Sequence, residues 1–180
     1  FVDSCRECPA CTGGIEQYCV KGSAQTYNST EMDRITPTYG GYSKNYVIDE
    51  KYALKVSATG DLSGIAPLLC AGITTYSPLK RWGAGPGKRL AVAGLGGLGH
   101  MGVKLAVAMG ADVTVLSTSP SKEADARALG ATGFINTKDS DAVKAATGKF
   151  DLLLDTISAN HDYNSYLGMV TIGGVMVVVG

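Results

Sequence analysis

Charged side chains are sparse in this sequence, and basic residues form no cluster. Only 18% of the 180 residues are charged, and 16 Lys and Arg balance 16 Asp and Glu, so the formal net charge is zero. Nucleic-acid backbones and anionic membrane surfaces select proteins with clustered Lys and Arg. We therefore predict that neither nucleic acid nor a membrane is a partner.

Long apolar runs are lacking too. The longest one, VMVVV at residues 175–179, is far too short to cross a bilayer. The sequence begins at Phe1 without a signal-peptide pattern, and it stops at Gly180 directly after this strand-like run. A buried strand needs neighbouring elements to cover it. We therefore expect the chain to be an interior fragment of a longer protein.

Glycine, in contrast, is abundant, with 24 residues concentrated in the second half. The first half instead carries scattered turn signals, which predict loops and antiparallel strands, with strand character at residues 42–49. The composition changes after Cys70, and residues 70–83 predict a helix that Pro78 kinks or interrupts. We expect two domains, at residues 1–71 and 72–180.

From residue 89 onward, apolar strand-like runs alternate with helical segments. Strands that are apolar along their whole length are typical of parallel sheets covered on both faces. The pattern therefore predicts an α/β fold with a doubly wound parallel Rossmann sheet. That sheet normally has six strands, and five are visible here: RLAVAGLG, DVTVLST, TGFINT, FDLLLDTI and GVMVVVG.

A glycine-rich turn follows the first of these strands and opens a helix. Its sequence, GLGGLG, fits the G-x-G-x-x-G fingerprint of dinucleotide binding. Gly94 permits the tight turn, Gly96 lets a pyrophosphate approach the backbone, and Gly99 lets the helix lie close to the strand. The helix N-terminus then offers free N–H groups to the phosphates. The alternative is a plain turn without a ligand. The candidate cofactor-binding residues here are Gly94, Leu95, Gly96, Gly97, Leu98 and Gly99.

Four of the five cysteines lie within fifteen residues, in the spacing C-x2-C-x2-C-x7-C. Four thiolates so close together can surround one zinc ion tetrahedrally, and a shell of four cysteines is typical of structural zinc. Disulfides or free thiols are the alternative, although such short loops rarely meet disulfide geometry. The predicted zinc ligands are Cys5, Cys8, Cys11 and Cys19.

In combination, these motifs resemble the zinc-dependent medium-chain alcohol dehydrogenases, and most of all the cinnamyl-alcohol dehydrogenase and broad-range aldehyde reductase branch. The resemblance includes PLLCAGITTYSPL at residues 67–79 and TYGGYSKNYV at residues 38–47. It implies that residues 1–71 are part of a GroES-like catalytic domain with a structural zinc lobe. It also implies that Cys70 is a catalytic residue and ligand of a catalytic zinc, whereas the sequence alone favours a buried structural thiol.

The sequence departs from this family at the catalytic zinc. The family's other ligands lie upstream, and the two histidines do not replace them: His100 opens the helix after the glycine turn, and His161 is expected at the surface at a helix start. The resemblance also implies cofactor contacts at Thr74, Thr156 and Gly180.

The cofactor is predicted from the loop after the second strand. An NAD site places a carboxylate there for the ribose hydroxyls. Here the loop offers three hydroxyls and then Lys122, whereas Asp112 comes too early and Glu123 too late. We therefore predict NADP, although the same segment also resembles an ordinary helix start. The predicted ligands of its 2′-phosphate are Ser117, Thr118, Ser119 and Lys122.

These observations favour a zinc-dependent oxidoreductase that transfers a hydride between NADP(H) and a primary alcohol or aldehyde. Two alternatives remain open: a zinc-free medium-chain reductase of quinones or enones, and a non-catalytic NADPH-binding module. By the resemblance, we expect a homodimer that acts on a small-molecule alcohol or aldehyde in the cytoplasm.

Overall fold

The computed structural model describes residues 1–57 and 59–180. The chain forms two compact units, Phe1–Ala58 and Thr59–Gly180, and each is treated by itself. The sequence predicted a catalytic domain at residues 1–71 and a cofactor domain at residues 72–180. That functional division stays a prediction.

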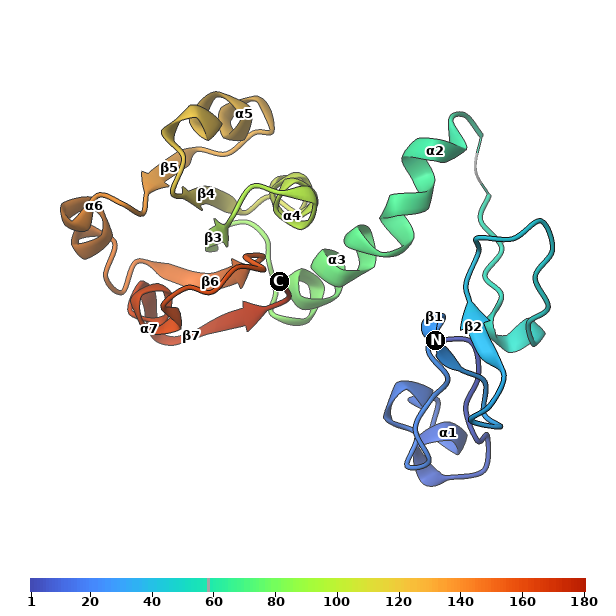
Figure 1. The fold of residues 1–180 in the computed structure, drawn as a ribbon. Helices are drawn as coiled ribbons and strands as arrows, with labels where there is room; N and C mark the ends of the chain where they lie inside the picture. The colour runs from blue at the N-terminus through green and yellow to red at the C-terminus, as the bar shows by residue number, and fades with distance from the viewer. Residues whose placement is uncertain (58) are drawn as a thin grey trace. The chain divides into compact units, whose positions relative to one another are not determined.

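The first unit consists of short elements joined by turns (Figure 1). Its two strands pair in antiparallel fashion, and an isolated bridge between Asp3 and Ala24 ties its N-terminal segment to the loop before the first strand. The elements are α1 (Pro9–Thr12), η1 (Glu16–Tyr18), β1 (Tyr27–Thr30), β2 (Pro37–Tyr39) and η2 (Glu50–Tyr52).

The strand expected at residues 42–49 does not form. The segment has no strand pairing, and Tyr42 and Val47 are almost fully exposed. β-Branched and aromatic residues favour strands only where they pack on a neighbouring surface. In this unit the pairing lies just upstream, between Tyr27–Thr30 and Pro37–Tyr39, so residues 42–49 are left outside the sheet.

The second unit opens with helices. α2 (Leu62–Ile65) and η3 (Ala66–Leu69) precede α3 (Ala71–Arg81), which continues through Pro78 to its end. No single helix in the described part of the chain is long and apolar enough to cross a membrane. Leu62–Leu69 and Ala71–Arg81 meet that test only together, across a bend of 49°.

The predicted Rossmann sheet is confirmed. Five parallel strands lie in the order β5-β4-β3-β6-β7, with α-helices between consecutive strands (Figure 1). The strands are β3 (Arg89–Ala93), β4 (Asp112–Ser117), β5 (Gly133–Asn136), β6 (Phe150–Asp155) and β7 (Val170–Val178). The intervening helical elements are α4 (Gly97–Ala108), η4 (Pro120–Lys122), α5 (Glu123–Ala128), α6 (Ser140–Ala145) and α7 (Tyr163–Leu167).

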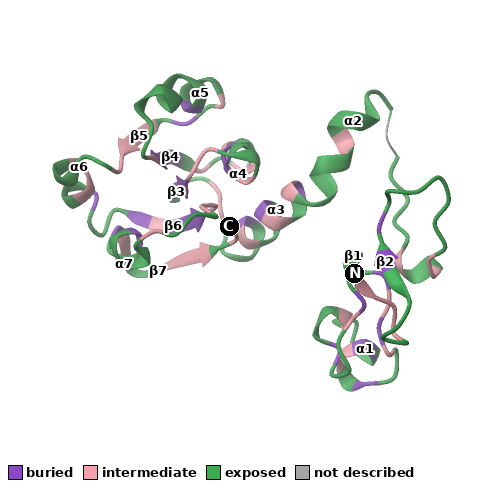
Figure 2. Cartoon of the chain, in the orientation of Figure 1, coloured by how far each residue is buried: buried purple, intermediate pink, exposed green. Residues whose placement is uncertain are grey.

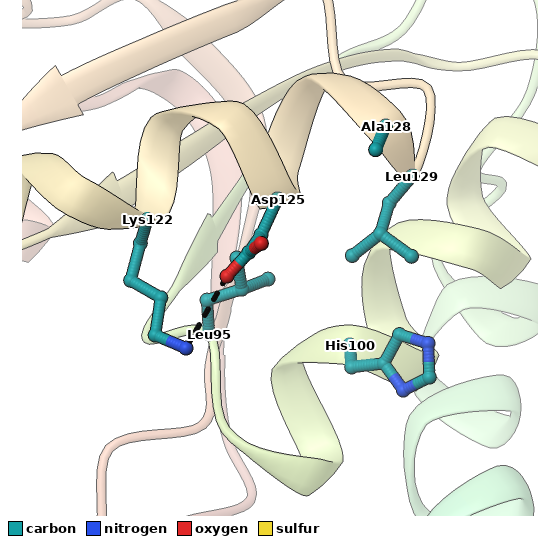
Figure 3. Close-up of a pocket in the computed structure, with 6 residues that line it drawn as sticks. All are labelled: Leu95, His100, Lys122, Asp125, Ala128 and Leu129. Atoms are coloured by element: carbon teal, nitrogen blue, oxygen red, sulfur yellow. Dashed lines mark hydrogen bonds and ion pairs between the residues drawn. The ribbon is translucent and has the colours of Figure 1, made fainter.

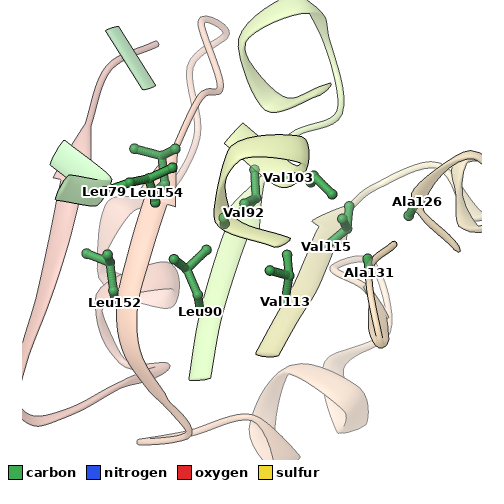
Figure 4. Close-up of a cluster of buried hydrophobic side chains, with 11 residues drawn as sticks. Leu79, Leu90, Val92, Val103, Val113, Val115, Ala126, Ala131, Leu152 and Leu154 are labelled. Atoms are coloured by element: carbon green, nitrogen blue, oxygen red, sulfur yellow. The ribbon is translucent and has the colours of Figure 1, made fainter. Parts of the chain in front are cut away.

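Helices cover both faces of this sheet, which is why its strands are apolar throughout. In β3, Leu90 and Val92 pack with side chains from α3, α4 and α5, as Figure 4 shows for this cluster. Their neighbours Ala91 and Ala93 pack on the opposite face, near α7. These four side chains of β3 are fully buried, whereas Arg89 at the start of the strand is exposed (Figure 2). β3 is therefore the centre of the unit, and its C-terminal end is held from both sides.

The turn from β3 into α4 depends on close backbone contact. Gly94 has φ of 86°, a left-handed conformation that favours glycine. A Cβ atom on Gly99 would lie 2.1 Å from the Gly94 carbonyl oxygen and 3.0 Å from Thr156 Oγ1. The packing role predicted for Gly99 therefore has a direct structural basis, because no side chain fits between the helix and the strand.

We expect Gly99→Ala to destabilise the protein by about 1–3 kcal/mol, since its methyl group must displace backbone atoms. The matched control is Gly97→Ala in the same helix turn, where a Cβ would meet no atom within 4 Å. That substitution should leave stability unchanged or raise it slightly. Urea unfolding of both variants measures the difference, and equal effects would contradict the close-contact explanation.

Candidate functional site

The four clustered cysteines converge on one point. Their sulfur atoms all lie within 4.8 Å of one another, and three of the four residues are buried. Local structure brings them together: Cys8 is the N-cap of α1, Pro9 occupies its first turn, and Arg6 has a positive φ of 62° that reverses the chain between Cys5 and Cys8. The predicted cluster of Cys5, Cys8, Cys11 and Cys19 therefore exists in the fold.

The spacing of these sulfur atoms suits a metal ion. A tetrahedral zinc with Zn–S bonds of about 2.3 Å places its sulfur ligands roughly 3.8 Å apart. The sulfur atoms of Cys5 and Cys11 are 3.8 Å apart, and those of Cys8 and Cys11 are 3.4 Å apart. Sulfur atoms in a disulfide are about 2.05 Å apart, and all five cysteines are free thiols in the structure. The donor set therefore fits one structural zinc ion.

The protonation of the thiols supports the same interpretation. Backbone N–H groups of Val20 and Cys11 donate to Cys8 and lower its pKa to about 6. For Cys11 the Ser4 hydroxyl acts to lower the pKa, but burial and the bond to Cys8 outweigh it and raise the pKa to about 11. Ionising one thiol thus makes ionisation of the next one costlier. A divalent cation would remove this conflict, because it binds thiolates.

Side chains around the lobe fix its position within the first unit. Ser4 Oγ lies 3.3 Å from Cys11 Sγ and 2.8 Å from Tyr52 Oη. The Ser4 hydroxyl group therefore links the Tyr52 hydroxyl group to one sulfur ligand. Arg6 forms ion pairs of 2.7 Å with Asp3 and 2.6 Å with Asp49. These contacts join the cysteine loop to the segment around residues 49–52.

Cys70 lies apart from any such cluster. It precedes α3, its side chain is exposed rather than buried, and it is a free thiol. Among the described residues, the only group of metal-ligating side chains that could hold an ion is the four-cysteine cluster. The alternative drawn from the sequence alone, a buried structural thiol at Cys70, is therefore wrong. The assignment as a catalytic zinc ligand stays a prediction, because this chain presents one ligand there and a catalytic zinc takes three.

A groove of about 450 Å³ lies at the C-terminal ends of the central strands, where α/β sheets bind ligands. Three segments line it: the glycine turn, the loop after β4 and the loop after β6. The lining residues are Gly94, Leu95, Gly96, Leu116, Ser117, Thr118, Ser119, Lys122, Thr156, Ile157, Ser158, Ala159, Asn160, His161 and Tyr166.

The glycine turn presents open backbone to this groove. A Cβ on Gly96 would meet no atom within 4 Å, so protein packing does not require a glycine at this position. Gly96 is also the N-cap of α4, and no side chain caps the first turn of that helix. The free N–H groups of this turn and the empty space beside Gly96 together suit a phosphate group.

The loop after β4 carries the residues predicted to bind a 2′-phosphate. Ser117, Thr118 and Ser119 line the groove together with Lys122, as predicted from the sequence. The Lys122 ammonium group is half-exposed and lies 3.4 Å from the Asp125 carboxylate. Figure 3 shows this pair at an adjacent pocket of about 330 Å³, which His100 also lines from α4. Lys122 therefore lines the groove, but its ammonium group also pairs with the Asp125 carboxylate.

The other predicted cofactor residues differ in position. Thr156 lines the groove, and its hydroxyl donates to the Ala93 carbonyl at 2.7 Å. Gly180 packs against the backbone of residues 156–157, where a Cβ would lie 2.5 Å from the Thr156 carbonyl carbon. The remaining ones do not line the groove: Thr74 lies on α3, and Gly97, Leu98 and Gly99 form the first turn of α4.

The structure adds one pair that the sequence interpretation missed. Asp155, at the end of β6, is fully buried, and its Oδ2 lies 2.7 Å from His161 Nε2. Only 10% of the His161 side chain is exposed, so its expected surface position is wrong. The last residue of β6 was the available signal, since an acid ending an apolar strand lies at the ligand edge of the sheet.

Comparisons with known proteins agree with this geometry. Residues 97–180 match a family described as zinc-binding dehydrogenase. Across its whole length the chain is 55% identical to the NADP-dependent alcohol dehydrogenase C 1 of Mycolicibacterium smegmatis, and it covers 52% of that protein. Residues 97–180 thus carry a zinc-binding dehydrogenase domain. The chain is also 48% identical, over its full length, to the probable cinnamyl alcohol dehydrogenase 6 of Arabidopsis thaliana, of which it covers 50%.

Solved structures of similar proteins share the fold. The cinnamyl alcohol dehydrogenase of Sorghum bicolor superimposes with a TM-score of 0.92 at 43% identity, over 99% of this chain and 51% of that one. The Helicobacter pylori enzyme, described as complexed with NADP(H), gives a TM-score of 0.89 at 41% identity, over 100% of this chain and 50% of that one. The chain spans about half the length of the curated relatives it matches.

We expect Cys8→Ser to remove one zinc equivalent per chain and to loosen residues 1–24, because a structural zinc contributes folding free energy to its own loop. Metal analysis and hydrogen exchange measure the two effects, and the exchange of β3, β4 and β6 should not change. Cys70→Ser is the matched control, and it should leave the protection of residues 1–24 intact. Metal-free protein with these cysteines paired as disulfides would contradict the zinc assignment.

Proposed function

We propose that the protein is a zinc-dependent, NADP-dependent oxidoreductase that interconverts primary alcohols and aldehydes. The observation that carries this proposal is the groove at the ends of β3, β4 and β6. It combines an uncapped helix N-terminus, open backbone at Gly96 and a β4 loop with hydroxyl groups in place of a carboxylate. The names of the similar proteins, NADP-dependent and cinnamyl alcohol dehydrogenases, support the same reaction class.

The residues of this chain bind and orient the cofactor in this proposal. The first-turn N–H groups of α4 hold the pyrophosphate, and the β4 loop holds the 2′-phosphate through its hydroxyl groups and Lys122. When bound, NADP(H) supplies the hydride acceptor or donor, and zinc would polarise the substrate oxygen. Cys70 as a catalytic zinc ligand is part of the proposal by family resemblance.

Two other functions were open from the sequence. A zinc-free reductase of quinones or enones would have no need for the four-cysteine lobe, whose sulfur spacing suits zinc. A non-catalytic NADPH-binding module would bind cofactor without turnover. Assaying NADPH oxidation with benzaldehyde-type and aliphatic aldehydes, alongside metal analysis, separates the three. The proposal also includes a homodimer in the cytoplasm. Sedimentation of the protein as encoded tests the dimer.

The pyrophosphate contact gives a test at Gly96. We expect Gly96→Ala to leave the free energy of unfolding unchanged, because the added methyl group meets no protein atom. The same methyl group would stand where the phosphate approaches, so NADPH affinity should fall roughly tenfold or more. Urea unfolding and fluorescence titration measure the two quantities. Unchanged NADPH affinity would contradict the proposed phosphate position.

The 2′-phosphate gives a test at Lys122. A hydrogen bond to a charged group contributes roughly 1.5–3 kcal/mol, and partial exposure of Lys122 favours the low end. We therefore expect Lys122→Ala to weaken NADPH binding about tenfold and to leave NADH binding almost unchanged. Asp125→Asn is the matched control, because it frees the ammonium group from its carboxylate and should strengthen NADPH binding. Equal losses for both cofactors, or a native preference for NADH, would overturn the NADP assignment.

A further inference from the structure

Asp155 is the only residue with a charged side chain that is buried in the described part of the chain. A buried carboxylate is costly unless hydrogen bonds and an opposite charge compensate it. Its Oδ1 accepts the N–H of Ile157 at 3.0 Å, and its Oδ2 faces His161 Nε2 at 2.7 Å. Both oxygens are therefore occupied by groups of the loop that follows β6.

The imidazole of His161 is equally well held. Its Nδ1 lies 2.8 Å from the Ala159 carbonyl oxygen, and its Nε2 faces Asp155. Both partners are acceptors, so the doubly protonated imidazolium is the form that satisfies them together. The ring packs against Tyr163 and Tyr166, with centroid distances of 4.4 Å and 5.3 Å. The His161 ring is thus held in place through both of its nitrogen atoms and by two aromatic neighbours.

This pair closes the loop at residues 156–161 from both ends. At the start, Thr156 donates to Ala93 in the neighbouring strand, and at the end His161 returns to Asp155. Every residue of the loop lines the groove. The loop contains no helix or strand, so the side-chain contacts at its two ends determine its shape.

The sheet order indicates which part of the cofactor this loop faces. β4 and β6 flank β3 on opposite sides, and a dinucleotide crosses the sheet at this switch point. The proposed 2′-phosphate residues follow β4, so the other half of the cofactor extends over the end of β6. A bare Asp155 carboxylate there would repel the phosphates, and the His161 cation offsets it.

We propose that His161, paired with Asp155, is a positioning residue that shapes the loop at 156–161 for the nicotinamide half of NADP(H). This inference rests on the proposed function. It assigns no chemical step to His161. The pair instead holds the wall of the groove in place, and the imidazolium offsets the Asp155 carboxylate beside a ligand that carries several negative charges.

Two probes separate the halves of the cofactor: NADPH, and adenosine 2′,5′-bisphosphate, which lacks the nicotinamide half. On the protein as encoded, we expect His161→Ala to weaken NADPH binding about tenfold or more, with little change for the bisphosphate. His161→Gln can still donate one hydrogen bond but carries no charge, so its loss should be smaller. Binding of the bisphosphate also shows that each variant has folded.

The matched control lies on the same strand. Asp151, at the opposite end of β6, forms a two-pronged ion pair with Arg89 and has a pKa lowered to about 2 by that contact. Asp151→Asn and Asp155→Asn therefore each remove one paired carboxylate from β6. Both should lower stability, but only Asp155→Asn should weaken NADPH more than the bisphosphate.

The pH profile adds a readout that a purely structural role would not move. The Ala159 carbonyl, followed by Asp155 and Asp162, raises the pKa of His161, with Tyr163 and Tyr166 as its other titratable neighbours. The imidazolium is present at low pH and is lost as pH rises through this raised pKa. The ratio of NADPH to bisphosphate affinity should fall across that range, and Asp155→Asn should move the fall to lower pH.

The outcomes are distinguishable. A wild-type protein that does not bind NADPH would overturn the proposed function, and this inference with it. NADPH binding that survives His161→Ala unchanged would sink the inference alone. So would equal losses of NADPH and bisphosphate, because the effect would then be general to the groove. A selective loss of NADPH together with the pH shift would support the role of the pair.

Discussion

The close approach of Gly99 to the Gly94 carbonyl oxygen is the constraint on which the second unit depends. Because no Cβ separates the two backbones, α4 begins directly above the end of β3. Gly96, the N-cap of α4, then lines the groove, and Thr156 comes close enough to bond Ala93 across the strand ends. A wider separation would pull the turn away from β6 and open the groove from both sides.

The two sites are held by different kinds of contact. The cysteine lobe is closed within fifteen residues, by the α1 cap at Cys8, the left-handed Arg6 and backbone N–H groups aimed at sulfur. Its stability is local, and a bound metal would add to it directly. The groove draws on three loops that are far apart in sequence. It exists only because parallel strands place their C-terminal ends side by side.

Charge is distributed unevenly along the groove. On the β4 side, hydroxyl groups and the half-exposed Lys122 face solvent, and the Lys122 ammonium group forms an ion pair with Asp125. On the β6 side, the fully buried Asp155 pairs with His161, whose side chain is only 10% exposed. The exposed side can adapt to a ligand, whereas the buried side is rigid, since breaking a buried pair leaves an uncompensated charge.

The sequence by itself determined whatever local spacing encodes. The alternation of apolar strands and helices predicted all five parallel strands, and the intervals between Cys5, Cys8, Cys11 and Cys19 predicted their convergence. Tertiary structure decided what depends on neighbours. Residues 42–49 look like a strand but find no pairing partner, Cys70 stands exposed and alone among the described ligands, and His161 is drawn inward by Asp155. A side chain's partner across a loop follows from the path of the backbone, and no residue pattern within the loop specifies that path.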